Sequence, residues 1–187
     1  MNKIILMMSV SLDGYFEGLD RDISWHRVDE ELHSYFNDQC RAMAGFFDGR
    51  VTHELMAEYW PTADQNQDAS EPEMEFAQIW RDARKYVFSR TLSEAGWNTT
   101  VISDVVPEQI EELKAQIGGD IALGGANLAA SFLRLGLVDE YRICVHPVVL
   151  GKGRPLFEDP EVQLNLTLEE TRTFGNGVVL LRYTNDR

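Results

Sequence analysis

Apolar residues recur along this chain in two spacings, one typical of strands and one typical of helices. Helical spacing predicts helices over residues 28–43, 51–59, 73–84, 107–117 and 125–135. Short apolar runs predict strands over residues 3–12, 45–48, 86–88, 99–102, 121–123 and 139–146. Because these strands and helices alternate, the pattern predicts a mostly parallel sheet with helices on both faces.

The C-terminal part has a different pattern. Two strands are predicted over residues 163–173 and 178–184, joined by Gly175-Asn176-Gly177, and Asn-Gly between apolar runs is typical of a hairpin. The expected fold is therefore a single α/β domain over residues 1–187: three layers, α/β/α, with a mostly parallel central sheet and an antiparallel C-terminal hairpin. An apolar strand at the sheet edge, Val178 to Leu181, would need a cover, so we expect a homodimer.

Composition narrows the class of protein. The 187 residues are 44% apolar, and no apolar run is long enough to cross a membrane. The apolar run near the N-terminus is shorter than that of a signal peptide and soon gives way to polar residues. Cys40 and Cys144 have no neighbouring cysteine. Both observations favour a cytoplasmic protein. The net charge of −14 argues against nucleic acid and anionic membranes as partners. A phosphorylated ligand would need cations placed locally.

The first candidate for such a site is Gly124-Gly125, between a buried strand and a helix. Glycine lets the backbone approach a ligand closely, and the N-terminus of a helix attracts phosphate. A tight turn without a ligand is the alternative. The sequence is not GxGxxG, so an ordinary dinucleotide-binding assignment does not apply.

Two similar clusters follow other strands. Gly49-Arg50-Val51-Thr52 opens a helix, and Ser89-Arg90-Thr91 follows the strand over residues 86–88. Taken alone, each cluster has an alternative role without a ligand, as a helix cap or a turn beside an arginine that points into solvent. Ligands bind beyond the carboxyl ends of strands in open α/β sheets. Three such clusters at three strand ends therefore predict a phosphate-binding site.

These clusters, in this order, resemble the dihydrofolate-reductase-like superfamily, and more closely the reductase domain of bifunctional riboflavin-biosynthesis enzymes. The resemblance covers almost the whole chain. Further segments that carry it are Met8 to Gly14, Trp25, Tyr59-Trp60-Pro61, Lys85 to Arg90, and Leu123 through Gly136–Glu140 to Pro147–Phe157.

The resemblance implies NADPH binding. The 2′-phosphate side of the cofactor would contact the Gly-Arg-x-Thr turn and the Ser-Arg pair, and the Gly-Gly turn would take the pyrophosphate. In this sequence the implied cofactor-binding residues are Gly49, Arg50, Thr52, Ser89, Arg90, Gly124, Gly125, Ala126, Asn127 and Leu128.

The catalytic and substrate residues are less determined. Asp13, at the end of the first strand, is the candidate catalytic residue, and an Asp-Gly turn is its alternative role. Trp25 is the candidate substrate contact, together with Trp60, and a core or loop-anchoring role is the alternative for both. The acids that open the first long helix, Asp29 to Glu31, stand where dihydrofolate reductases carry a carboxylate, but they equally suit the helix dipole. No metal is expected, because Ala57 replaces the second histidine of an HExxH motif.

The leading hypothesis is an NADPH-dependent reductase of a small heteroaromatic substrate, of pterin or aminopyrimidine type, as the resemblance implies. The alternative is a non-catalytic protein that binds NADPH or another nucleotide on the same fold. A ligand-free structural domain is a third possibility. Lys152 and Arg154 lie in a glycine-rich loop that we expect to close the C-terminal strands or a dimer face, and contact with a phosphate is their alternative role. His146 is interpreted as structural.

Overall fold

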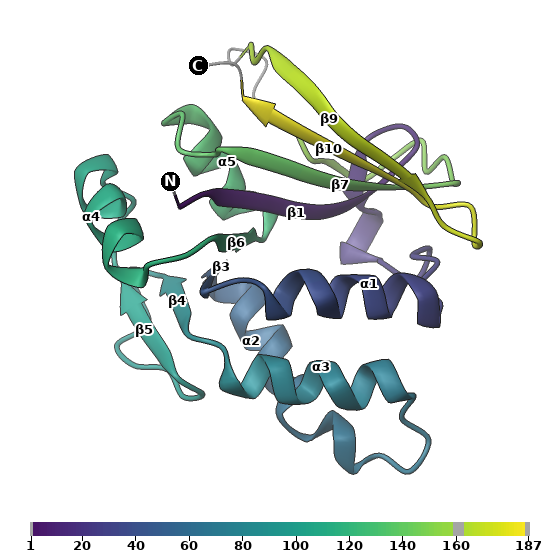
Figure 1. Ribbon diagram of the computed structural model, residues 1–187, viewed down its shortest axis with the longest axis horizontal. Helices are drawn as coiled ribbons and strands as arrows, with labels where there is room; N and C mark the ends of the chain where they lie inside the picture. The colour runs from purple at the N-terminus through teal and green to yellow at the C-terminus, as the bar shows by residue number, and fades with distance from the viewer. Residues whose placement is uncertain (1, 159–162, 186–187) are drawn as a thin grey trace.

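The computed structural model describes residues 2–158 and 163–185, and an eight-stranded sheet forms its centre (Figure 1). The strand order is β5-β4-β3-β6-β1-β7-β10-β9. Six strands run parallel: β1 (Ile4–Ser11), β3 (Gly45–Gly49), β4 (Lys85–Phe88), β5 (Thr99–Ile102), β6 (Ile121–Gly124) and β7 (Glu140–His146). The hairpin strands β9 (Leu166–Thr173) and β10 (Val179–Asn185) are antiparallel. The carboxyl ends of the six parallel strands therefore meet at one edge.

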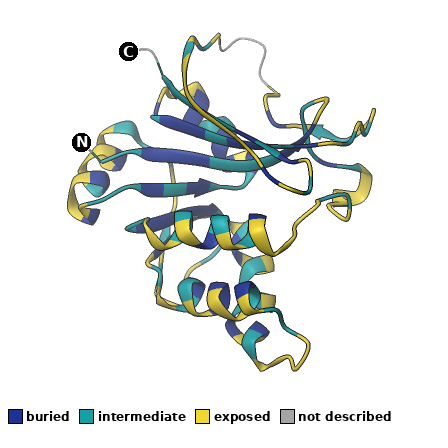
Figure 2. Cartoon of the chain, turned by 45° about the vertical axis from the view of Figure 1, so that its right-hand side comes forward, coloured by how far each residue is buried: buried dark blue, intermediate teal, exposed yellow. Residues whose placement is uncertain are grey.

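Helices cover both faces of the sheet, which confirms the expected three layers. On one face lie α1 (Glu30–Arg41), α2 (Arg50–Tyr59) and α3 (Glu71–Asp82), and on the other α4 (Pro107–Ile117) and α5 (Ala126–Arg134). Strand β3 shows why: side chains alternate along a strand, so Phe46 packs with Trp80 of α3 whereas Phe47 packs with Phe132 of α5. Figure 2 shows the inner strands buried and the outward helix surfaces exposed.

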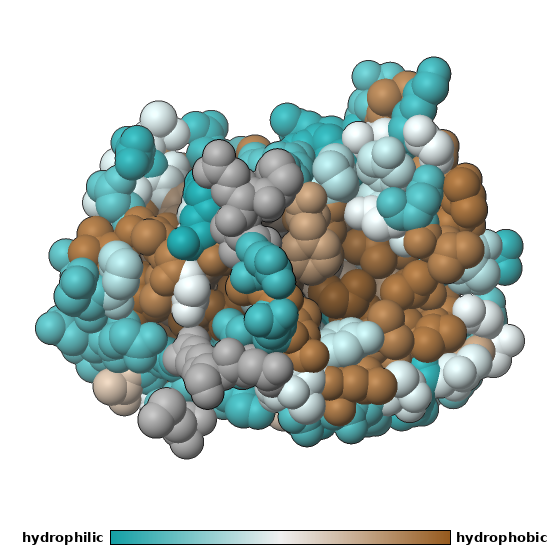
Figure 3. Space-filling view, turned by 90° about the horizontal axis from the view of Figure 1, so that it is seen from above, coloured by the Kyte–Doolittle hydropathy of each residue, from teal (hydrophilic) through white to brown (hydrophobic). Residues whose placement is uncertain are grey.

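The hairpin forms as predicted and contributes an edge strand, but the apolar strand expected to need a cover is not that edge. Strand β10 pairs with both β7 and β9, so it is not an edge, and Leu180 is buried. The edge strand is β9, whose exposed Glu169, Glu170 and Arg172 discourage pairing with another chain. Seen from above, apolar surface gathers in a hollow on the side of the molecule that carries the hairpin (Figure 3). The homodimer itself stays a prediction.

Two further differences concern the connecting segments. Between the helices predicted over residues 51–59 and 73–84, Trp60–Gln65 form a 3-10 helix (η2), and α3 already begins at Glu71. A capping box between Ser70 and Glu73 fixes that start. The segment after β1 contains β2 (Tyr15–Glu17), which pairs with β8 (Arg154–Pro155). No helix among the described residues is long and apolar enough to cross a membrane.

Candidate functional site

Two adjoining cavities open at the carboxyl edge of the parallel strands. The first, of about 1080 Å³, lies where β3, β4 and β6 end and where α2 and α5 begin. The second, of about 790 Å³, lies under α1, α2 and α3. The residues that line both cavities are Met7, Met8, Ser9, His26, Phe36, Thr52 and Gly125. We call this shared wall the junction, and it makes the two cavities parts of one cleft.

The three sequence clusters come together at the first cavity. Strands β4, β3 and β6 are neighbours in the sheet, so the turns that follow them are neighbours as well. Nine of the ten predicted cofactor residues line this cavity, and Gly124 lines the second. The nine are Gly49, Arg50, Thr52, Ser89, Arg90, Gly125, Ala126, Asn127 and Leu128.

The glycine turn is built for close approach. Gly125 has φ +81°, and a Cβ added there would stand 2.5 Å from Thr52 Oγ1. Gly49 and Gly125 are also the N-cap residues of α2 and α5, so neither helix has a side-chain acceptor for its first N–H groups. Two helix N-termini with open donors beside a Cβ-free turn fit the phosphates of a dinucleotide.

Arginines supply the cations that the acidic chain otherwise lacks. Arg50 donates to Glu54 (2.6 Å) and to Thr91 Oγ1 (2.7 Å), and Arg90 donates to Asp104 (2.7 Å). These pairs are exposed, and such pairs stabilise a protein by only about 0–1 kcal/mol, so an incoming phosphate competes for them easily. The five arginines that line the cavity are Arg21, Arg50, Arg90, Arg134 and Arg154.

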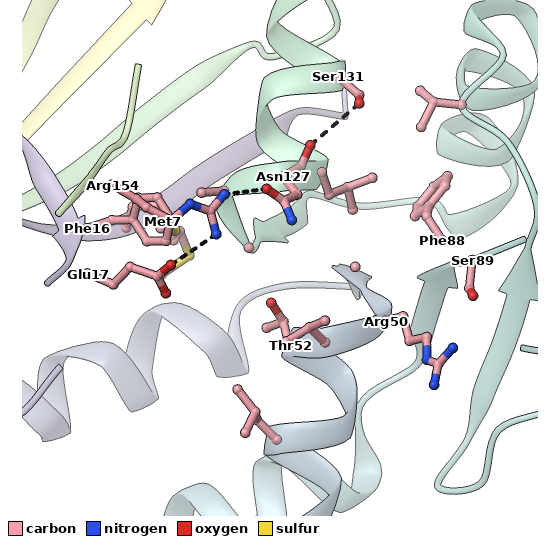
Figure 4. A pocket seen from close by; sticks show the side chains of 18 of the residues that line it. Met7, Phe16, Glu17, Arg50, Thr52, Phe88, Ser89, Asn127, Ser131 and Arg154 are labelled. Carbon is pink, nitrogen blue, oxygen red and sulfur yellow. Dashed lines mark hydrogen bonds and ion pairs between the residues drawn. The ribbon is translucent and has the colours of Figure 1, made fainter. Parts of the chain in front are cut away.

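Arg154 is a cavity residue that the sequence interpretation placed elsewhere. Its guanidinium donates to Glu17 (3.0 Å) and to Asn127 Oδ1 (2.5 Å), at the opposite end of the cavity from Arg50 and Ser89 (Figure 4). The β2–β8 pairing brings it there. That pairing needs glycine at position 153, where a Cβ would stand 2.2 Å from the carbonyl oxygen of Glu17. Lys152 is exposed and not part of either described wall.

Asp13 does not have the position that its predicted catalytic role requires. It lies outside both cavities, and its carboxylate accepts hydrogen bonds from Ser11 Oγ (2.6 Å), Leu150 N (3.1 Å) and Gly151 N (2.8 Å). These bonds, that of Ser11 foremost, lower its pKa. Asp13 therefore ties the β1 exit turn to the 150–151 loop, and neither cavity supports the catalytic role, which stays a prediction.

Trp25 is likewise outside both cavity walls, and the neighbouring His26 lies in the junction instead. The Trp25 indole donates to the Asp22 carbonyl (3.0 Å), and its ring meets His26 edge-on at 4.2 Å. His26 in turn stacks on buried His146 at 5.1 Å. Burial lowers the pKa of His26, and it lowers that of His146 to about 4. Trp25 thus packs against a neutral histidine of the junction, and its contact with substrate stays a prediction.

The second cavity contains a carboxyl group that sequence reasoning missed. Its walls include the aromatic residues Phe36, Phe46, Trp60 and Phe76. Asp48 shares the face of Phe46 on β3, is only 7% exposed, and lines this cavity. Burial raises its pKa to about 7, against the opposing charge of Lys85. In the sequence Asp48 is only the last residue of the strand predicted over residues 45–48. The signal that could have identified it is its alternation with Phe46 directly before Gly49-Arg50.

Comparisons with known proteins agree with this architecture. Residues 2–180 match the family model described as the RibD C-terminal domain. The uncharacterized protein YyaP of Bacillus subtilis (strain 168) is 40% identical over 182 residues, covering 97% of this chain and 94% of YyaP. A putative riboflavin biosynthesis protein from Shewanella sp. PV-4 has the same fold, with a TM-score of 0.76, 20% identity and 99% coverage of both chains.

A second solved structure is a bifunctional protein. It is the diaminohydroxyphosphoribosylaminopyrimidine deaminase/5-amino-6-(5-phosphoribosylamino)uracil reductase of Thermotoga maritima. The TM-score is 0.68 at 16% identity, and the match covers 99% of this chain and 57% of that one. At this identity the likeness concerns the fold alone.

Proposed function

The chain belongs to the RibD C-terminal domain family, and from that premise we propose that it is an NADPH-dependent reductase of a small heteroaromatic substrate, of pterin or aminopyrimidine type. The observation that carries the proposal is the division of one cleft into two halves. An arginine-lined half adjoins an aromatic half through the junction, which includes Met7, Thr52 and Gly125. A cofactor and a flat substrate placed in the two halves would meet there.

The residues of the first half have separate tasks in this proposal. The Gly124-Gly125 turn and the N-terminus of α5 hold the pyrophosphate, because their N–H groups lack side-chain acceptors. Arg50, Ser89 and Arg90 hold the 2′-phosphate, which distinguishes NADPH from NADH. When bound, NADPH supplies a hydride. The methionines of the junction exclude water from the place where the two halves meet.

Exposed apolar side chains around the first half support a bound ligand. Ile23, Val51, Leu55 and Leu135 line the cavity although 43–60% of each is exposed. Apolar residues gathered around a cleft mark a surface that a ligand covers. The rings and ribose carbons of a dinucleotide are a suitable cover. The cytoplasmic location expected from the sequence belongs to the same proposal.

A non-catalytic nucleotide-binding protein is the second candidate, and the position of Asp13 favours it, because the predicted proton donor lies outside the cleft. Two measurements separate the candidates. Thermal unfolding with and without NADPH tests binding, and a shift upward is expected under both. Loss of the reduced-nicotinamide absorbance with dihydrofolate, dihydropterins or the phosphoribosylaminouracil named for the Thermotoga protein tests turnover. No thermal shift at millimolar NADPH contradicts the reductase and leaves the second candidate only with another nucleotide as its ligand, whereas turnover of any acceptor excludes the second candidate.

A further inference from the structure

The two halves of the cleft differ sharply in charge. The first half has five arginines against the two acids Glu17 and Asp104. The second half contains no lysine or arginine among its described lining residues. Its ionisable groups are the carboxyls of Asp29, Glu30, Asp48 and Glu73, the thiol of Cys40 and the imidazoles of His26 and His33.

The two histidines do not compensate for those carboxyls. Burial lowers the pKa of His26 and of His33, so both imidazoles are neutral at neutral pH. A phosphate group in the second half would therefore face acidic groups without a cation, between aromatic walls. Burying an unpaired anion is strongly unfavourable. The second half is thus unsuited to a phosphorylated ligand.

Asp48 has the most buried carboxyl group of the four in this half. No described residue hydrogen-bonds or ion-pairs with its carboxyl group, although it is more than nine-tenths buried. Its position is next to the glycine turn, because a Cβ at Gly124 would stand 2.7 Å from Asp48 Oδ1. A buried carboxyl that lacks a partner and faces a cavity is placed to accept a hydrogen bond from a ligand.

The charged and titratable groups around Asp48 do not satisfy it. Lys85 on β4 donates its ammonium protons to the carbonyls of Trp80 (2.5 Å) and Ala83 (2.8 Å). Cys40 on α1 has a pKa raised to about 12 by burial, and His53 on α2 has a lowered pKa, so both are neutral at neutral pH. A donor from a ligand is the partner that remains.

We propose that the second half of the cleft selects an unphosphorylated, uncharged or cationic aromatic substrate, whose ring N–H or amino group donates a hydrogen bond to Asp48. This inference rests on the proposed function, because only an enzyme has a substrate. The geometry of the cavity and of Asp48 supports the ligand class even without turnover. Phe36, Phe46 and Trp60 supply apolar walls for the ring. The role of Asp48 is recognition of the substrate.

The test uses the protein saturated with NADP⁺, so that the arginine-lined half is filled. Cytidine and cytidine 5′-monophosphate are the matched probes, because they differ only by a phosphate, and 2,4-diaminopyrimidine is the cationic probe. Calorimetric titration should show that cytidine or the diamine binds, and that the monophosphate binds at least about tenfold more weakly than cytidine. The proposal is overturned if the monophosphate binds as tightly as cytidine does. It is also overturned if neither cytidine nor the diamine binds.

Asp48→Asn tests the contact itself, and Asp68→Asn, on an exposed loop, is the matched control. Asp48→Asn should lower the affinity for cytidine by about tenfold and leave the affinity for NADP⁺ unchanged. Asp68→Asn should change neither affinity. Unchanged cytidine affinity in Asp48→Asn overturns the assignment of Asp48. The wild-type protein gives an independent check if the variant folds poorly. Its affinity for cytidine should rise between about pH 5.5 and pH 8.5, as Asp48 becomes a carboxylate, and a flat profile contradicts the contact.

The outcomes separate this inference from the proposed function. If NADP⁺ does not bind while cytidine binds in an Asp48-dependent way, the reductase proposal fails and the ligand class stands. If NADP⁺ binds and NADPH reduces only phosphorylated acceptors, the reductase proposal stands and the ligand class fails.

Discussion

The hydroxyl of Thr52 on α2 lies 2.5 Å from the point that a Cβ would occupy at Gly125, so the turn after β6 and the start of α2 approach as closely as a glycine allows. Gly125→Ala would force this clash and would also place an alanine at φ +81°. We expect a loss of stability of about 1–3 kcal/mol and a loss of NADPH binding. Urea unfolding and cofactor titration measure the two effects.

Gly136→Ala is the control for backbone strain alone. Gly136 has φ +66°, but a Cβ there meets no atom within 4 Å. The control should therefore lose stability of the same order while it keeps NADPH affinity. If Gly125→Ala binds NADPH as tightly as the wild type does, the turn is not part of the cofactor site.

Arg50 and Arg90 should discriminate between the two nicotinamide cofactors. Arg50 lies at the end of the first cavity where Ser89 also lies, and Arg90, the next residue after Ser89, lines the same cavity. Charge-assisted hydrogen bonds to a phosphate are the strong ones. Arg50→Ala or Arg90→Ala should lower the affinity for NADPH by about tenfold or more and the affinity for NADH by less than about threefold. Arg84→Ala removes an exposed arginine that lines neither cavity and should change neither affinity. Equal losses of NADPH and NADH would show that these arginines do not read the 2′-phosphate.

The sequence predicts the sheet and the first cavity well because both depend on local patterns. The turns at Gly49, Ser89 and Gly124 each follow a buried strand, and parallel strands bring such turns to one edge. The cavity position of Arg154 was only an alternative in the sequence, and that of Asp48 was missed, for a different reason. Arg154 reaches the cavity through the β2–β8 pairing, and Asp48 faces inward through the alternation of β3, so their roles depend on contacts between segments far apart in the sequence.

The homodimer predicted from the sequence has a candidate surface, although β10 is not an edge. Val145, Val179 and Leu181 lie on the face of β7 and β10 that points away from α1, and they are only half-buried. We propose that a second copy covers this face. The wild-type protein should sediment at twice 21.3 kDa, and Leu181→Glu should shift it toward the monomer. Gln116→Glu on exposed α4 is the charge control. A wild-type monomer at micromolar concentration contradicts the proposal.

Glu140 gives a prediction for acid stability. This carboxylate is fully buried at the start of β7 and accepts hydrogen bonds from Lys3 (2.7 Å), Arg142 (2.8 Å) and Arg182 (2.8 Å). Burial alone would raise its pKa, but the three cations together lower it to about 2. The folded pKa is thus below the unfolded value, so the stabilising contribution is present at neutral pH and is lost as the pH falls through about 4 toward about 2.

Glu140→Gln should reduce the free energy of unfolding by about 3–5 kcal/mol at neutral pH, because it removes the buried carboxylate that largely buried Arg142 and the partly exposed Lys3 and Arg182 share. The difference from the wild type should shrink as the pH falls, and urea unfolding at several pH values measures it. Glu170 contacts the same Arg182 at 3.4 Å from an exposed position, so Glu170→Gln should cost only about 0–1 kcal/mol. A difference between Glu140→Gln and the wild type that stays constant down to about pH 3 would contradict the lowered pKa.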